Sequence, residues 1–138
     1  MIKVQLDKGA FKPERAHPFD AGMDLRSPRS LQIPAHGSGI IDTGVHIEIP
    51  EGYVGVLMSK SGLNVKHDLT SEGVIDCEYT GSIVVKLYNS GSTSYKVERG
   101  DKITQLLIMP VVLENVEVVD EITKNDNRGN GGFGSTGR

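Results

Sequence analysis

Alternation of apolar and polar residues is the strongest pattern in this chain, and it predicts β-strands. The first alternation places Ile2, Val4 and Leu6 on one side of a short strand. The clearest strand carries one nearly apolar face, made of Ile41, Thr43, Val45, Ile47 and Ile49. A Pro-Glu-Gly sequence at 50–52 then marks a turn, so the chain is expected to double back there.

Later segments repeat this pattern. Two further strands are predicted, one with Val54, Val56 and Met58 and one with Ile83, Val85 and Leu87. A last strand is apolar on both faces, with Ile103, Gln105, Leu107 and Met109 on one side and Leu106 and Ile108 on the other. Such a strand is expected at the centre of a sheet or at an interface. The β-branched run 111–119 is a further candidate strand, which could be exchanged with or packed on another subunit.

Helical periodicity is scarce, and only residues 61–66 leave room for a short helix. The 17 glycines and 6 prolines divide the chain into short pieces. Many short strands predict an all-β fold, a jelly-roll-like β-barrel with little helix. With 138 residues and 37% hydrophobic content, the chain suits one β-barrel domain over 1–123, followed by a flexible C-terminal arm over 124–138.

Charge and cysteine content narrow the functional classes. A net charge of −3 without a lysine or arginine block argues against binding to nucleic acid or to an anionic membrane. No segment has the apolar length of a membrane span or of a signal peptide. Cys77 is the only cysteine, which excludes an internal disulfide and a cysteine-built zinc site. We therefore expect a cytoplasmic protein, or one of the host-cell cytoplasm if the source is viral.

The C-terminal sequence RGNGGFGSTGR (128–138) has two open interpretations. Gly/Ser-rich ends are usually idle flexible tails. The same composition also suits an arm that orders around a nucleotide, because glycine N–H groups, hydroxyls and an arginine bind phosphate and Phe133 offers a flat surface for a base. Neither a P-loop nor a Rossmann pattern accounts for these glycines, so such an arm would close over a ligand held elsewhere.

Four other polar clusters lie where strand patterns stop. Their sequences are AGMDLRS (21–27), SKSGL (59–63), GVIDCEYTG (73–81) and GDKITQLL (100–107). Taken one at a time, each also suits a structural role, such as a capped turn, a helix N-cap or a hairpin turn. Their order along the chain is more informative than any one of them.

In this order, the four clusters and the C-terminal sequence resemble the five motifs of the homotrimeric deoxyuridine triphosphatases (dUTPases), from Ala21 to Gly137. The resemblance implies a jelly-roll β-barrel and three subunits around an axis. It also implies active sites at subunit interfaces, with the tail of one chain closing a site formed by the others. The implied reaction is Mg²⁺-dependent hydrolysis of dUTP to dUMP and pyrophosphate, which limits dUTP and supplies dUMP for thymidylate synthesis.

Asp76 is the candidate catalytic residue. Three residues, Gly-Val-Ile, lead from a strand into a turn, so its carboxylate would emerge at the edge of a partly dry pocket and could orient a water. An aspartate with a pKa of about 3.9 is a weak base at neutral pH, so burial or a nearby phosphate should raise the pKa, or Asp76 acts mainly by positioning. By resemblance, Asp76 activates the water that attacks the α-phosphorus.

Tyr79 is the candidate sugar-binding residue. If it flanks a tight turn together with Asp76, both side chains lie on the same face, and its ring can pack against a sugar. The resemblance implies contact with deoxyribose, where a 2′-hydroxyl would clash, and uracil recognition by backbone groups of this hairpin, including Gly73 and Ile75. Near Thr70 and Ser71 many dUTPases carry asparagine, so the base-reading side chain of this chain is not defined by the motif.

The remaining segments supply groups for the triphosphate and its metal. The resemblance assigns phosphate contacts to Lys60, Ser61, Gly62, Gln105, Arg128, Ser135 and Thr136. It places Phe133, with Gly134, over uracil. It assigns Asp24 to Mg²⁺ through a water, and one carboxylate suffices because Mg²⁺ takes most of its oxygens from the triphosphate. Most dUTPases have arginine at the position of Lys60, and lysine keeps the charge but loses the bidentate fork.

Two other functions remain as alternatives at this stage. A dCTP deaminase shares the broad fold, but it requires a glutamate-based deamination site, and the segments at 73–81 and 128–137 favour the triphosphatase. A nucleotide-responsive regulator that uses dUTP as a switch is the second alternative. The short stretch between the fourth cluster and the C-terminal sequence leaves no room for an obvious extra domain.

Overall fold

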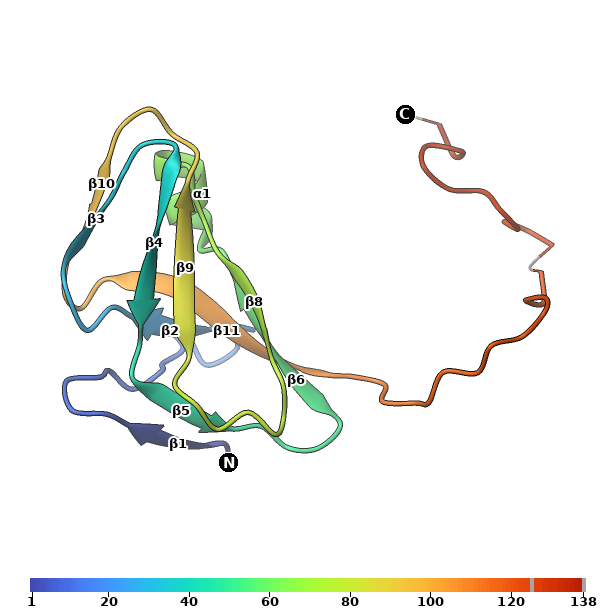
Figure 1. Cartoon of the computed structure of the whole chain (residues 1–138), viewed down its shortest axis with the longest axis horizontal. Coiled ribbons are helices and arrows are strands. Elements are labelled where there is room, and N and C mark those ends of the chain that lie inside the picture. The colour runs from blue at the N-terminus through green and yellow to red at the C-terminus, as the bar shows by residue number, and fades with distance from the viewer. Residues whose placement is uncertain (125, 138) are drawn as a thin grey trace.

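A computed structural model describes residues 1–124 and 126–137, and it consists of short strands wrapped around one apolar core (Figure 1). In chain order the elements are β1 (Lys3–Leu6), β2 (Met23–Arg26), β3 (Leu31–Ile33), β4 (Gly37–Asp42), β5 (Val45–Glu48), β6 (Tyr53–Met58), α1 (Ser61–His67), β7 (Leu69–Thr70), β8 (Glu72–Ile75), β9 (Val84–Asn89), β10 (Tyr95–Val97) and β11 (Lys102–Pro110). The all-β class and the short helix are confirmed.

In the described part of the chain, the strands form four antiparallel sheets. Their strand orders are β1-β5, β10-β3, β2-β11-β6-β8 and β4-β9-β7. The strand predicted to be central, β11, lies between β2 and β6, and β9 lies between β4 and β7. None of the described sheets closes on itself, so the term barrel describes the arrangement only loosely.

The predicted apolar face of residues 41–49 is confirmed, but it belongs to two strands. All five of its residues are buried: Ile41, Thr43, Val45, Ile47 and Ile49. The strand breaks after Asp42, where Gly44 has φ of 68° and its N–H donates to Asp42 Oδ1 (3.0 Å). Thr43 Oγ1 donates to the Ile83 carbonyl oxygen (2.6 Å), so the break is itself anchored to the neighbouring chain segment.

The inward face of β6 differs from the sequence pattern. Gly55 and Leu57 are buried, whereas Met58 is 48% exposed. A Cβ at Gly55 would lie 2.8 Å from Ile49 Cδ1, so the strand crosses the core where only glycine fits. The alternating apolar residues of β6 therefore mark its outer face, because a glycine gives no apolar signal at a core position.

The candidate strand at 111–119 does not form within the single chain, and its exchange with or packing on another subunit stays a prediction. Strand β11 ends at Pro110, the Val111 N–H donates to the Gly52 carbonyl oxygen (2.9 Å), and the following described residues extend away from the body (Figure 1). Residues 112–119 are exposed, and they pair with none of the described strands. Among the described helices, none is long and apolar enough to cross a membrane.

Candidate active site

Asp24 forms the centre of a buried charge cluster on β2. Its side chain is 7% exposed, its Oδ1 accepts a hydrogen bond from Lys60 Nζ, and its Oδ2 lies 2.8 Å from Lys102 Nζ. Burial alone would raise the pKa of Asp24, but hydrogen bonds from Lys102 and Lys60 outweigh it and hold the pKa below its ordinary value. Asp24 is therefore an ionised carboxylate between two ammonium groups.

Gln105 lies beside this cluster because β11 pairs with β2 in a register that places it opposite Asp24. Its Nε2 donates to the Ser59 carbonyl oxygen (3.1 Å). A Cβ at Gly22 would lie 2.3 Å from Gln105 Oε1, so the glycine of the AGMDL sequence leaves the space that the amide occupies. Two of the sequence clusters thus meet through strand pairing.

The 59–62 segment enters the same cluster from the end of β6. Lys60 has an extended backbone (φ −77°, ψ 128°), and Ser61 and Gly62 begin α1, where the first N–H groups of a helix lack acceptors within the helix. Ser59 Oγ donates to the Ser71 carbonyl oxygen (3.1 Å) and accepts from the Ser71 N–H (2.9 Å). Double pairing to Ser71 fixes the point from which Lys60 reaches Asp24.

Ser71, near which the sequence leaves the base-reading group undefined, is buried. Its Oγ lies 2.7 Å from Thr104 Oγ1, and Thr104 Oγ1 in turn donates to the Met58 carbonyl oxygen (3.0 Å). Thr104 therefore connects β11 to the end of β6, and the Ser71 side chain is tied to β11 through Thr104. Thr70, its neighbour, is exposed.

Asp76 and Tyr79 lie on the turn that follows β8. The Tyr79 N–H donates to the Asp76 carbonyl oxygen (3.1 Å), which closes the tight turn that the sequence predicts. Tyr79 Oη donates to the Ser82 carbonyl oxygen (2.7 Å), and a Cβ at Gly81 would lie 2.5 Å from Tyr79 Oη. The ring is thus held over Gly81, which must remain a glycine for the ring to lie there.

The Asp76 carboxylate is exposed in the single chain rather than set in a partly dry pocket. It borders an open hollow with Ile49, Glu51, Cys77, Glu78 and Leu113. Gly73 and Ile75, the residues assigned to uracil, lie on β8 opposite Leu57 and Gly55 of β6. The strands β8 and β9 belong to different sheets, so the segment 73–83, which we call the Tyr79 hairpin, turns between two strands that do not pair with each other. Any drying of the Asp76 environment must come from a ligand or another chain.

Two separate groups result within one chain. Strand pairing brings Asp24, Lys60, Ser61, Gly62 and Gln105 together, while Asp76 and Tyr79 lie beyond the opposite end of the β6-β8 pair. Met58 faces Glu72 at one end and Gly55 faces Ile75 at the other, so roughly four residues, about 13 Å of strand, separate Ser59 from the Asp76 turn.

The C-terminal candidates form a third group that the structure does not bring to either of the others (Figure 1). Arg128 Nε donates to the Gly131 carbonyl oxygen (2.6 Å), and Phe133 is fully exposed. Gly134, Ser135 and Thr136 continue the same exposed segment, with φ of 91° at Gly134. Residues 125 and 138 of the predicted arm lie outside the described residues.

Sequence reasoning missed Lys102 and His46. Lys102 stands in the GDKITQ sequence three residues before Gln105, and the register of β11 against β2 shifts between Lys102 and Thr104. That shift accompanies the ion pair between Lys102 and Asp24, and no sequence periodicity indicates it. His46 lies on β5, and its ring contacts the hairpin that carries Tyr79.

The all-β body presents two lysines around one buried carboxylate, and the C-terminal segment adds an arginine, glycines and hydroxyls, all groups that can bind phosphate. The chain belongs to the dUTPase family, whose family model matches residues 10–137. Two similar proteins are the deoxyuridine 5′-triphosphate nucleotidohydrolases of Clostridium acetobutylicum and Gloeothece citriformis. They are 43% and 42% identical to this chain, and each alignment covers 99% of it and 96% of the relative.

The chain is also similar in structure to solved dUTPases. The dUTPase of Staphylococcus bacteriophage 80alpha with dUpNHpp has a TM-score of 0.93 and 32% identity, and covers 100% of this chain and 99% of its own. A mutant dUTPase from phage phi11 of S. aureus, described with a structural Mg(II) ion, has a TM-score of 0.82 and 30% identity over 88% of this chain and 97% of its own. The fold expectation and the family resemblance are both confirmed.

Proposed function

We propose that this chain hydrolyses dUTP to dUMP and pyrophosphate at a site assembled from more than one copy of the chain. As a member of the dUTPase family it is a dUTP diphosphatase, and relatives that carry this activity in their names align with it over nearly its whole length. One observation supports a site that is assembled from several chains. The Asp24 cluster, the Asp76 turn and the C-terminal arm each present ligand-type groups, yet one chain keeps them apart.

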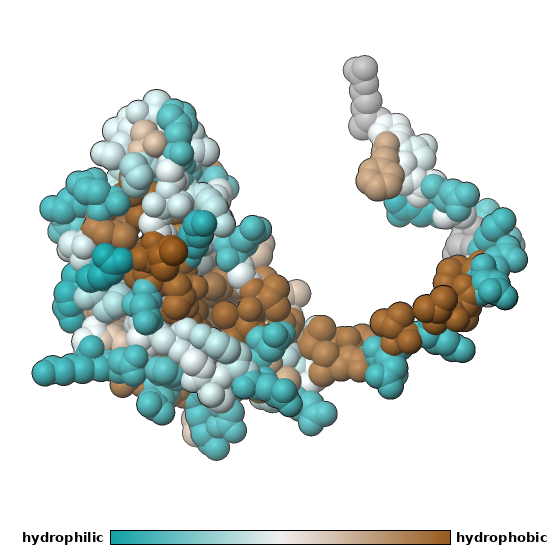
Figure 2. Space-filling model, in the orientation of Figure 1, coloured by the Kyte–Doolittle hydropathy of each residue, from teal (hydrophilic) through white to brown (hydrophobic). Residues whose placement is uncertain are grey.

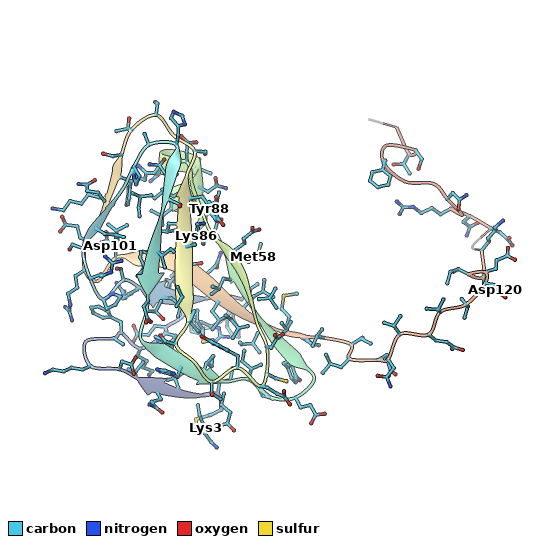
Figure 3. The ribbon with its side chains drawn as sticks, in the orientation of Figure 1. Lys3, Met58, Lys86, Tyr88, Asp101 and Asp120 are labelled. Carbon is cyan, nitrogen blue, oxygen red and sulfur yellow. The ribbon has the colours of Figure 1, made fainter. Side chains whose placement is uncertain are left out.

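Exposed apolar surface supports association into a homotrimer. Met58 on β6 and Tyr88 on β9 line the same hollow next to the Asp24 cluster, and they are 48% and 41% exposed in the single chain (Figure 3). Apolar surface continues from the strands along the segment that follows β11 (Figure 2). The exposed apolar residues of this segment include Val112, Leu113, Val116, Val118 and Ile122. Surface of this extent favours contact with another copy.

In the proposed chemistry, Asp76 accepts a hydrogen bond from a water and directs it to the α-phosphorus. The water oxygen forms the new P–O bond, and the bond from the α-phosphorus to the bridging oxygen breaks, so pyrophosphate leaves with that electron pair. The proton of the water passes to Asp76 and then to solvent. Phosphoryl transfer depends mainly on positioning and electrostatics. The groups that donate hydrogen bonds to the phosphates would therefore supply much of the rate enhancement.

Lys60, Ser61, Gly62 and Gln105 are the proposed phosphate ligands on the body. In the single chain Lys60 pairs with Asp24, so we propose that its ammonium group turns to a phosphate oxygen when the triphosphate arrives. Lys102 then remains to hold Asp24. Ser61 and Gly62 offer N–H groups at the start of α1. The side-chain amide of Gln105 donates a hydrogen bond to the carbonyl oxygen of Ser59, two residues before Ser61.

Asp24 fits an indirect role toward Mg²⁺. Within residues 1–124 and 126–137 there is no group of three or more His, Cys, Asp or Glu side chains that could cage a metal, so an ion here would depend on triphosphate oxygens and water. Asp24 is ionised and would accept from a metal-bound water once Lys60 has moved. The chemistry that Mg²⁺ supplies is neutralisation of phosphate charge.

The nucleoside end of dUTP is assigned to the Asp76 hairpin and the arm. Tyr79 would pack on the deoxyribose, and backbone groups of Gly73 and Ile75 would read uracil. Arg128, Ser135 and Thr136 would contact phosphates, and Phe133 with Gly134 would cover the base. Fixing each arm residue costs about 1–2 kcal/mol, so the arm closes only when the triphosphate supplies compensating contacts.

We assign the protein to the cytoplasm, or to the host-cell cytoplasm if the source is viral.

One experiment separates the candidate functions. Pure protein is incubated with Mg²⁺ and each deoxynucleoside triphosphate, and pyrophosphate and ammonia are measured. Selective pyrophosphate release from dUTP supports the proposal, whereas ammonia from dCTP indicates a deaminase. For the catalytic assignment, Asp76→Asn should abolish hydrolysis yet still bind a non-hydrolysable dUTP analogue in a titration, and retained turnover would contradict it. Binding of dUTP without turnover in the wild type would favour a regulator.

A further inference from the structure

His46 links the Tyr79 hairpin to the body. It lies on β5 opposite Gln5 of β1, and its side chain is 25% exposed. Nδ1 lies 2.8 Å from the backbone oxygen of Thr80, the residue after Tyr79, and Nε2 lies 3.1 Å from Oδ1 of Asp7. The imidazole therefore bridges the nucleoside-binding hairpin and the segment that follows β1.

Both ring nitrogens of His46 face acceptors. A neutral imidazole has one N–H, so one of the two contacts would then join two acceptor atoms. The imidazolium has two N–H groups and satisfies both. Hydrogen bonding to the Thr80 carbonyl, followed by that to Asp7, raises the pKa of His46 above its ordinary 6.5, against a small opposing effect of burial.

The other charged groups near His46 also favour the imidazolium or pair with each other. Asp42, at the end of β4, adds a negative charge. Lys3 on β1 and Glu48 on β5 line the same hollow as His46 and form an exposed ion pair at 3.4 Å. Asp7 and Asp42 are therefore the two charges that bias the ring.

A second connection to the hairpin does not depend on His46. Ser82 Oγ donates to Asp42 Oδ1, and the Ser82 carbonyl oxygen accepts from Tyr79 Oη (2.7 Å). The hairpin is thus held at two successive points, through Thr80 and through Ser82. Of these two connections, only the one through Thr80 involves His46, so titration of His46 should loosen the hairpin without releasing it.

We propose that His46 is a positioning residue for nucleotide binding, which in its imidazolium form holds the Tyr79 hairpin in its binding geometry through Thr80. This inference rests on the proposed function, in which Tyr79 contacts the deoxyribose. When the proton is lost, Thr80 or Asp7 faces a bare ring nitrogen, and the hairpin shifts. Binding of dUTP then weakens as pH rises, while the chemical step on bound dUTP changes less.

The test compares the pH dependence of KM and kcat for dUTP hydrolysis in the wild type, His46→Gln and His36→Asn. In the wild type we expect KM to rise about fivefold as His46 loses its proton, the effect of about one hydrogen bond, with a smaller change in kcat. His46→Gln should have a raised KM without this step. His36 lies on the turn before β4 with φ of 53°, which asparagine tolerates, so His36→Asn should keep the wild-type step.

Two further measurements distinguish positioning from a structural role. Asp7→Asn should move the KM step to lower pH, because the carboxylate no longer favours the charged ring. In an NMR titration of the full chain, saturating dUMP should raise the pKa of His46, since coupling between two binding events is reciprocal. Titration of the substrate itself is common to all variants and cancels in the comparison.

The outcomes are separable. Absence of pyrophosphate release from the wild type overturns the proposed function. Two results with an active wild type would overturn the role of His46 alone. The first is a KM step that persists in His46→Gln, and the second is a pKa of His46 that does not change when dUMP binds.

Discussion

Lys102 Nζ lies 2.8 Å from Oδ2 of Asp24, across the pairing of β11 with β2. Asp24 therefore has a second ammonium partner besides Lys60. Under the proposed function, Lys102 would keep Asp24 in place when Lys60 turns to the phosphates, and this division of roles can be tested by substitution.

Replacing Lys102 with methionine should destabilise the protein. Asp24 is buried and would lose one of its two partners, so the free energy of unfolding in urea should fall by about 1–3 kcal/mol. Lys96→Met is the matched control, because Lys96 pairs with Glu98 at 3.2 Å with both side chains exposed, and such pairs contribute less than about 1 kcal/mol. Equal losses in the two variants would contradict the role of Lys102.

Asp24 should make stability depend on pH in the acid range. Burial raises its pKa, but the hydrogen bonds from Lys102 and Lys60 outweigh this and place the pKa in the folded chain below the ordinary 3.8. Its contribution is therefore present above pH 3.8 and is lost as pH falls through the lower, folded value. The unfolding free energy of the wild type minus that of Asp24→Asn should shrink over this interval. A difference independent of pH would rule out the ion pairs as its cause.

Gly81→Ala should impair catalysis by displacing Tyr79. The new Cβ would lie 2.5 Å from Tyr79 Oη and 2.6 Å from Cζ, so the ring must move off its present position. We expect kcat/KM for dUTP to fall by about 10- to 100-fold, as small misplacements of binding groups can do. Tyr79→Phe, which loses only the hydrogen bond to Ser82, should cost about fivefold. A smaller loss in Gly81→Ala than in Tyr79→Phe would argue against ring placement.

Deletion of residues 128–138 should leave a folded trimer with severely reduced turnover. The described residues of this segment are almost all exposed, so thermal stability and sedimentation should match those of the full chain. We expect kcat/KM to fall by at least about 100-fold, because Arg128, the hydroxyls and Phe133 no longer close over the nucleotide. Full activity of the truncated protein would refute the catalytic role of the arm.

The sequence predicted the strands better than their contacts. Alternation identified the buried face of Ile41, Val45 and Ile47, and the both-sided apolar pattern identified β11 as central. It misplaced the inner face of β6, because Gly55 occupies the core position and Met58 lies outside. Periodicity reports apolar side chains, and it cannot distinguish a strand face that is buried in the core from an apolar face that is exposed on the single chain.

For the candidate site, the sequence alone determined the five candidate segments and their order, because these segments hold distinctive combinations of glycine, acid, amide and hydroxyl. Only the tertiary structure decided that Asp24 is held by Lys102 as well as Lys60, that His46 bridges Thr80 and Asp7, and that the Asp24 cluster and the Asp76 turn lie apart. The physical reason is that strand register joins residues distant in sequence, and register depends on the packing of the whole core rather than on local pattern.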